Sequence, residues 1–283
     1  MARSTPDSTP RISFEYFPPK TPAGRDKLLQ ETTPALQALN PAFFSVTYGA
    51  GGSTRENTLG VASAIREAGI EVAPHLSFGG DDEAAIGALL DTYRERGIRR
   101  LVALRGDMPS GMGGTTQLVY ASQLVAFIRQ RSGDHFRIEV AAYPEIHPEA
   151  KSYDSDLKYL KAKLDAGADS AITQYFFNVE YYFYILDQCA AIGIDKPVYA
   201  GVMPIINFAN LARFSRNCGA EIPRWICQRV AGYGEDQESI RKFGIEVVTQ
   251  LCQTLLESGA PGIHFYTMNQ VEPTREIYRN LGL

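Results

Sequence analysis

A carboxyl group in an apolar setting is the first feature of this sequence that could do chemistry. Glu15 lies in the run SFEYF, which two prolines follow. Burial of this kind raises the pKa of a carboxyl group and suits it to donate a proton near neutral pH. The alternative for Glu15 is a structural ion pair with a nearby Arg or Lys, and the residue types alone favour neither interpretation.

A second candidate is the segment LRGD (104–107), which directly follows a strand-like run. It would place Arg105 and Asp107 at the end of that strand, and Gly106 would let the backbone approach a ligand closely. The same four residues are also compatible with an ordinary turn in which Asp107 caps a helix.

Three further segments could hold a ligand. Tyr143 and His147 in AAYPEIHPEA (141–150) could bind a cofactor, although lone histidines, including His75 and His264, are more often structural. Asp156 and Lys163 are seven residues apart and therefore share one face of a predicted helix, which is either solvated or in contact with a polar cofactor tail. Gln174 offers a neutral amide that suits the edge of a heterocycle.

Several common site motifs are absent from the sequence. It contains neither GxGxxG nor a Walker A motif, and GAGGS (49–53) is either an anion cradle or a flexible loop. The four cysteines form no CxxC pair, and no histidine lies at metal-ligand spacing from them. We therefore expect no metal site and reduced, partly buried thiols.

Eight short apolar runs alternate with helical patterns along the chain and must position these residues. The predicted strands are 11–17, 43–49, 72–78, 99–106, 137–143, 169–176, 197–203 and 262–268. The predicted helices lie near 24–39, 54–68, 82–96, 116–131, 153–166, 180–192, 207–217, 222–231, 236–258 and 273–281. Several helices are expected to end at a glycine, as at Gly69 and Gly97.

This alternation allows a closed parallel barrel or an open doubly wound sheet. An open nucleotide-binding sheet should begin with a glycine-rich turn, whereas the first strand here ends in Tyr-Phe-Pro-Pro. Polar residues also gather at the carboxyl ends of nearly all strands, which converge on one rim in a barrel. We therefore predict an α/β fold with a single (β/α)8 TIM barrel over residues 11–283, preceded by a disordered tail at 1–10.

The composition limits the classes of partner that the chain is expected to bind. The 283 residues include 28 basic and 32 acidic side chains and no basic block, so nucleic acid is not an expected partner. The apolar runs are too short to cross a membrane, and the N-terminus lacks the apolar region of a secretory signal. These features predict a cytoplasmic protein.

An ordered set of segments resembles the 5,10-methylenetetrahydrofolate reductase family. The set comprises FEYFPPK (14–20), VTYGAGG (46–52), APHL (73–76), ALRGD (103–107), AAYPEIHPEA (141–150), DAGADSAITQYFF (165–177) and HFYTMN (264–269). The resemblance implies a bacterial-type enzyme that consists of the catalytic domain, without control by adenosylmethionine. It implies bound FAD, NADH or NADPH as co-substrate, and reduction of methylenetetrahydrofolate to 5-methyltetrahydrofolate by a ping-pong relay, a step of one-carbon metabolism that serves methionine biosynthesis.

The resemblance also assigns roles to residues of this chain. Glu15 matches the general acid and Asp107 the acidic residue beside flavin and pterin. The implied FAD contacts are Thr47, His75, Arg105, Gly106, Asp107, Tyr120, Ala121, Tyr143, His147, Asp156, Tyr159 and Lys163. The implied substrate contacts are Glu15, Gln174, Asn210, Phe214, Tyr266, Met268 and Gln270.

Three of these positions depart from the bacterial pattern. Tyr159 replaces a small amide, Asn210 replaces a Gln, and Gln270 replaces an Arg that helps to hold the folate glutamate tail. Two alternatives remain at this stage. One is a proline dehydrogenase-like flavoenzyme that uses Arg275 and Arg279, and the other is a catalytically silent folate or flavin binder. A homo-oligomer is compatible with the sequence.

Overall fold

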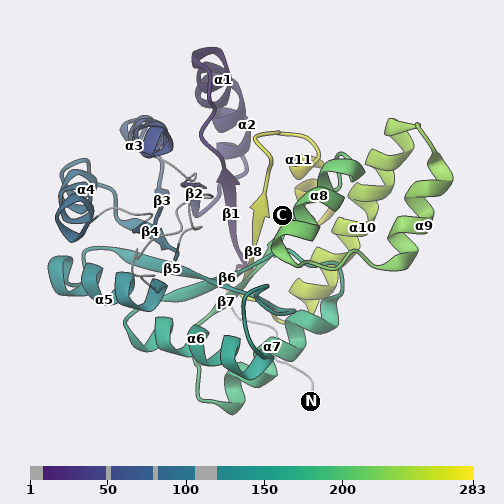
Figure 1. Ribbon diagram of the computed structural model, residues 1–283. Coiled ribbons are helices and arrows are strands. Elements are labelled where there is room, and N and C mark those ends of the chain that lie inside the picture. Colours follow the sequence, from purple (N-terminus) through teal and green to yellow (C-terminus); the bar gives the residue numbers. More distant parts are fainter. Residues whose placement is uncertain (1–8, 49–51, 79–81, 106–119) are drawn as a thin grey trace.

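Eight parallel strands close into one barrel, with the helices outside it. The computed structural model describes residues 9–48, 52–78, 82–105 and 120–283. The strands pair in sequence order, and the last pairs with the first (Figure 1). They are β1 (Arg11–Tyr16), β2 (Phe43–Val46), β3 (Val72–Leu76), β4 (Arg100–Ala103), β5 (Arg137–Ala142), β6 (Ser170–Thr173), β7 (Val198–Val202) and β8 (Gly262–Tyr266). The predicted single (β/α)8 barrel is confirmed.

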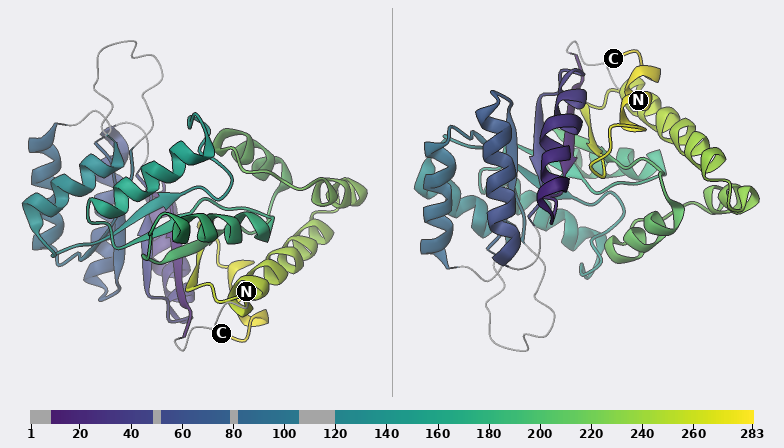
Figure 2. Two further views of the ribbon diagram at one scale, coloured as in Figure 1. Left: turned by 90° about the horizontal axis from the view of Figure 1, so that it is seen from below. Right: turned by 90° about the horizontal axis from the view of Figure 1, so that it is seen from above.

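The helices cover the outside of the strands from several directions (Figure 2). They are α1 (Pro22–Lys27), the π-helical turn η1 (Leu28–Thr32), α2 (Thr33–Gln37), α3 (Gly52–Glu67), α4 (Glu83–Glu95), α5 (Ala121–Ser132), α6 (Tyr153–Asp165), α7 (Val179–Ala191), α8 (Phe208–Cys218), α9 (Arg224–Tyr233), α10 (Gln237–Glu257) and α11 (Thr274–Asn280). Among the helices of these ranges, none has the length and apolar character needed to cross a membrane.

The first predicted helix, 24–39, is interrupted by a π-helical turn. Pro34 lies in the first turn of α2 and has no N–H to donate to the preceding helical turn. The hydroxyl of Thr33 instead donates to the Leu28 carbonyl over 2.8 Å. A missing backbone donor in a continuous helix is a common cause of such a local widening.

The predicted helix ends are confirmed at glycines. Gly69 and Gly97 have φ angles of 79° and 73°, in the left-handed region where a side chain would be strained. Helix starts are fixed by side chains: Asp82 accepts a hydrogen bond from the Ala85 amide, and Ser152 accepts one from Ser155. These two caps fix the residues at which α4 and α6 begin.

Alternation along the strands separates two sets of side chains. One set packs between the barrel and the helices and forms the main apolar core. The other faces the barrel interior, where Phe43, Ala73, Val102, Ile172 and Tyr199 form a smaller buried cluster. Inward positions above this cluster lie at the carboxyl ends of the strands and therefore line the mouth of the barrel.

Candidate active site

Glu15 lies at the barrel mouth among polar groups from neighbouring strands. In the strand register it pairs with Ser45 on β2 and with Tyr266 on β8. The Ser45 hydroxyl donates to Glu15 Oε2 over 3.1 Å. The Nε2 atoms of His75 and His264 lie 3.1 Å and 3.2 Å from the same oxygen. One carboxylate oxygen is thus the meeting point of three polar side chains.

The surroundings of Glu15 lower its pKa. Burial acts to raise the pKa of this carboxyl group, but the charges and hydrogen bonds of His75 and His264 together lower it more, so it lies below the ordinary value of 4.5. The expectation of a raised pKa is therefore wrong for the ligand-free protein. The partners are histidines from β3 and β8, not the Arg or Lys of the alternative interpretation.

His264, expected to be a structural histidine, is buried among aromatic rings and also contacts Glu15. Its ring is fully buried, and Nδ1 lies 2.7 Å from the Ser13 hydroxyl while Nε2 faces Glu15. Ser13 and Glu15 are two residues apart on β1, and their partners on β8 are His264 and Tyr266. On each strand the two polar residues are two positions apart and therefore lie on the same face of the strand. This pattern, in strands that are otherwise apolar, is the sequence signal that could have identified His264.

Tyr266 crosses the barrel interior because one strand carries a glycine. Its hydroxyl donates to the Thr173 carbonyl over 2.7 Å, and its ring meets that of His264 edge-on. A Cβ atom on Gly201 would lie 2.8 Å from the Tyr266 ring and 2.0 Å from the Thr173 carbonyl oxygen. Burial raises the pKa of Tyr266 above its ordinary value, so its phenol stays protonated.

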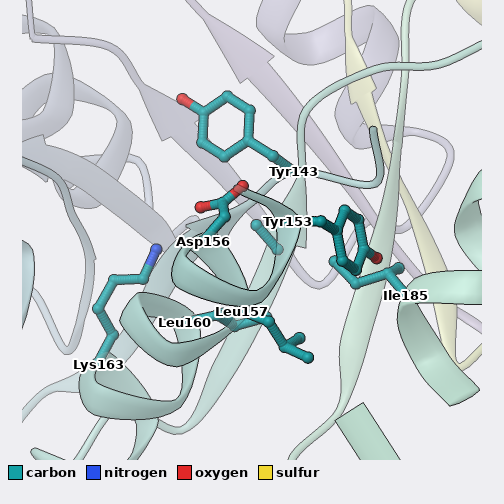
Figure 3. A pocket seen from close by; sticks show the side chains of 8 residues that line it. Tyr143, Tyr153, Asp156, Leu157, Leu160, Lys163 and Ile185 are labelled. Atoms are coloured by element: carbon teal, nitrogen blue, oxygen red, sulfur yellow. The ribbon is translucent and has the colours of Figure 1, made fainter. Parts of the chain in front are cut away.

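A pocket beside the mouth is lined by three of the predicted cofactor residues, Tyr143, Asp156 and Lys163. It is lined by Ala142, Tyr143, Tyr153, Asp156, Leu157, Leu160, Lys163 and Ile185. Figure 3 shows Asp156 and Lys163 projecting from α6 on the side of Tyr143. Asp156 accepts a hydrogen bond from the His147 amide over 2.8 Å, and the His147 ring packs edge-on against Tyr143. The helix face that carries Asp156 and Lys163 is therefore part of a pocket wall.

Basic groups of this region have lowered pKa values or carry an acidic partner. Burial lowers the pKa of Lys163 to about 8, although nearby Asp156 opposes the shift. Burial also lowers the pKa of His147. Arg105, which follows β4, forms an ion pair with Glu149 over 2.5 Å. Of these groups, Lys163 and Arg105 place positive charge at one side of the mouth near neutral pH.

The remaining predicted cofactor residues lie around the same rim. Thr47 follows β2, and its amide donates to the Tyr16 carbonyl. Tyr120 and Ala121 begin α5, and the ring of Tyr120 stacks on that of Tyr159 from α6. Gly106 and Asp107 lie outside the described residues, as do residues 49–51 of the glycine-rich segment.

The predicted substrate residues divide between the mouth and its edge. Gln174 directly follows β6, and its amide oxygen accepts a hydrogen bond from the Tyr175 backbone. Phe214 is half-buried on α8, whereas Asn210 on the same helix is exposed. Met268 and Gln270 follow β8, and Gln270 is exposed. Arg275, considered for a clamp on an amino-acid carboxylate, is already paired with Glu272.

The sequence matches one protein family along almost its whole length. The family described as methylenetetrahydrofolate reductase matches residues 1–282. The chain is 40% identical over 273 residues to 5,10-methylenetetrahydrofolate reductase of Pectobacterium carotovorum, covering 96% of this chain and 90% of that protein. The protein of the same name from Escherichia coli is 39% identical with the same coverage. Methylenetetrahydrofolate reductase (NADH) 1 of Arabidopsis thaliana is 37% identical over 286 residues, and the match covers 96% of this chain and 48% of that protein.

Solved structures show the same fold at lower sequence identity. A Clostridium thermocellum protein, described as binding two copies of 5-methyl-5,6,7,8-tetrahydrofolic acid, has a TM-score of 0.68 and 17% identity. The match covers 96% of this chain and 93% of that one. Oxaloacetate acetylhydrolase, with a TM-score of 0.52 and 11% identity, shares the barrel architecture.

Proposed function

Because the chain belongs to the methylenetetrahydrofolate reductase family, we propose that it reduces 5,10-methylenetetrahydrofolate to 5-methyltetrahydrofolate through bound FAD, with NADH or NADPH as donor. Family membership supports the reduction of methylenetetrahydrofolate itself. The structural observation that carries the proposal is the carboxyl group of Glu15, held at the barrel mouth between His75 and His264. We further propose one catalytic domain over residues 11–283, acting in the cytoplasm by a ping-pong reaction, alone or as a homo-oligomer.

The pocket beside the mouth suits the polar parts of FAD. Lys163 and Arg105 offer cationic groups for the pyrophosphate, and the buried Tyr153 hydroxyl has no hydrogen-bond partner within the described ranges. Tyr143 lines the pocket wall, and the His147 ring packs edge-on against it. When bound, FAD would accept two electrons from the nicotinamide and pass them to the folate.

Glu15 would supply the proton that the folate reaction needs. Opening the imidazolidine ring expels N10, an amine that leaves poorly unless it is protonated. In the ligand-free protein the contacts of His75 and His264 lower the pKa of Glu15, and their Nε2 atoms lie within 3.2 Å of its Oε2. Substrate in the mouth would exclude water, and this desolvation favours the neutral carboxyl group, the form of Glu15 that can donate a proton.

Other residues would bind and orient the substrate. Gln174 would bind the pterin edge through its amide, and Tyr266 would close the interior side of the mouth. Phe214 and Asn210 on α8, with Met268 and Gln270 after β8, would contact the folate and nicotinamide. Asp107 would stabilise the iminium cation formed when the ring opens.

The spectrum of the purified protein tests this function. The protein should be yellow and release FAD on denaturation, its flavin should bleach anaerobically with NADH or NADPH, and methylenetetrahydrofolate should restore the colour. A colourless protein that cannot be reconstituted with FAD would sink the proposal. Bleaching without reoxidation by the folate would instead indicate a different flavoenzyme, and folate binding without flavin would indicate a silent binder.

A further inference from the structure

One asparagine side chain continues the hydrogen bonding between β1 and β8 beyond their last paired residues. The strand register ends at Glu15 opposite Tyr266. The Asn269 side chain accepts a hydrogen bond from the Phe17 amide over 3.0 Å and donates one to the Phe17 carbonyl over 2.8 Å. A carboxamide carries the same donor and acceptor as a peptide unit. Asn269 therefore takes the place of the next backbone pairing between β1 and the segment that follows β8.

The local sequence explains why a side chain is needed at this point. Pro18 and Pro19 follow Phe17 and have no N–H, so the backbone of β1 cannot donate hydrogen bonds beyond Phe17. After β8 the chain changes direction at Met268 and Asn269, whose φ angles are 54° and 56°. Asparagine tolerates this left-handed conformation better than most residues that carry a side chain. The Asn269 amide thus reaches back to a strand end that backbone pairing does not hold.

These contacts lie beside the carboxyl group proposed as the proton donor. The Thr267 hydroxyl donates to the Glu15 carbonyl over 2.7 Å, so Glu15 and Phe17 are both tied to the segment after β8. A general acid must lie within hydrogen-bonding reach of the atom that it protonates. A displacement of about 1 Å can cost on the order of 10²-fold in rate, so the position of this strand end affects the chemistry.

Resting on the function proposed above, we propose that Asn269 is a positioning residue for proton transfer from Glu15. Its amide is bonded to the backbone of Phe17, so it acts through the end of β1 and not on the substrate. By fixing Phe17, it limits how far the Glu15 carboxyl group can move. That carboxyl group then stays where its Oε2 lies within 3.2 Å of two imidazoles.

Asn269→Gly tests this role, because glycine adopts the left-handed backbone without strain while both hydrogen bonds to Phe17 are lost. Both bonds are exposed, so water can replace them and the variant should fold. The limiting rate of flavin reoxidation by methylenetetrahydrofolate should fall by about 10- to 100-fold, the cost of a misplaced acid. Flavin reduction by the nicotinamide should keep its rate, and the folate concentration that gives half-maximal reoxidation should be unchanged.

A second variant shows whether Asn269 acts through Glu15. In Glu15→Gln the acid that Asn269 positions is absent, so adding Asn269→Gly should cause no further loss of the limiting rate. Rapid-mixing measurements would compare the two single variants with the double variant.

Asn40→Gly is the matched control. Asn40 also has a left-handed φ, 52°, and is exposed, but it precedes β2 at the opposite end of the barrel. Its replacement should leave both half-reactions unchanged. Three results would overturn the positioning role and leave the proposed function intact: an unchanged limiting rate in Asn269→Gly, a loss confined to folate affinity, or an equal further loss in the Glu15→Gln background. If the folate fails to reoxidise the flavin of the unaltered protein, both proposals fail.

Discussion

At the scale of single residues, the site depends on how one carboxyl group shares its surroundings with two imidazoles. Glu15 Oε2 accepts a hydrogen bond from the Ser45 hydroxyl and faces the Nε2 atoms of His75 and His264. Burial and histidine contacts act on its pKa in opposite directions, and the histidine contacts win. The balance can shift when a ligand changes the polarity of the mouth, as a proton donor requires.

Removing one imidazole should reverse this balance. In His264→Gln the charge and hydrogen bond of the imidazole are lost while burial remains, so we expect the pKa of Glu15 to rise. Infrared difference spectra against Glu15→Gln would report the protonated carboxyl group. It should appear at higher pH in His264→Gln than in the unaltered protein, and an identical titration would show that His264 does not control Glu15.

The same shift has a consequence for stability against acid. A carboxyl whose folded pKa is lowered stabilises the fold above its unfolded pKa, near the ordinary value of 4.5. That stabilisation is lost as the pH falls from the unfolded pKa through the folded pKa. In His264→Gln the folded pKa of Glu15 should lie closer to the unfolded value, so this contribution should be smaller and its loss complete at a higher pH, as thermal unfolding at a series of pH values would show.

The sequence identified Glu15 but not the chemistry of its setting. A run such as SFEYF indicates burial, which raises a carboxyl pKa, and says nothing of side chains that come from other strands. His75 and His264 lie 60 and 249 residues away in the chain, and only closure of the barrel brings them to Glu15. Prediction of the direction of the pKa shift required the strand register.

At the scale of elements, β7 leaves room for a side chain of its neighbour β8. The Thr173 carbonyl accepts the Tyr266 hydroxyl directly beside Gly201, where a Cβ atom would lie 2.0 Å from that carbonyl oxygen. No side-chain rotation relieves a contact with the backbone. A glycine at this point of β7 is therefore part of how Tyr266 reaches across the mouth.

Gly201→Ala should lower the thermal midpoint and reduce turnover of the folate, because either the strand or Tyr266 must move. Gly232→Ala on α9 is the matched control, since a Cβ atom there meets nothing within 4 Å and alanine favours a helix. Both variants would be followed by thermal unfolding and folate turnover. Equal thermal midpoints and equal folate turnover in the two variants would show that the space above Gly201 is not needed.

Elements were predicted from sequence more reliably than their interruptions. Alternating apolar runs and glycine stops such as Gly69 indicated every strand and most helices, because both patterns are local. The π-helical turn Leu28–Thr32 was not predicted, since Pro34 is also a normal residue at the start of a helix. In this chain Pro34 follows a widened helical turn, in which the Thr33 hydroxyl donates to the Leu28 carbonyl.

At the scale of the whole molecule, the two ends of the barrel interior have different roles. The mouth contains the polar side chains proposed for catalysis, while the opposite end is closed by an ion cluster. Glu139, fully buried, accepts hydrogen bonds from Arg11 over 3.1 Å and Arg100 over 3.2 Å. The Arg11 guanidinium also lies 3.3 Å from the centre of the Tyr199 ring. Burial raises the pKa of Glu139 despite these arginines.

Glu139→Gln should destabilise the fold by about 3–5 kcal/mol, because it leaves buried guanidinium groups without their carboxylate. Turnover per folded molecule should be unchanged, since the cluster lies away from the mouth. Lys242→Ala, which breaks an exposed pair with Glu238, is the control and should not change stability measurably. Denaturant unfolding would compare them, and equal stabilities would show that the cluster does not hold the barrel closed.

The role proposed for Glu15 is to supply the proton for reduction of methylenetetrahydrofolate. Its most direct test is rapid-mixing measurement of both half-reactions in the unaltered protein and in Glu15→Gln, which keeps the shape of the side chain but removes the acid. The nicotinamide should bleach the flavin at similar rates in both proteins, because that step needs no proton from Glu15. Reoxidation by methylenetetrahydrofolate should be slower in the variant by about 10²–10⁴-fold, the usual cost of lost general acid catalysis. Near-normal reoxidation of the variant would show that Glu15 is not the proton donor.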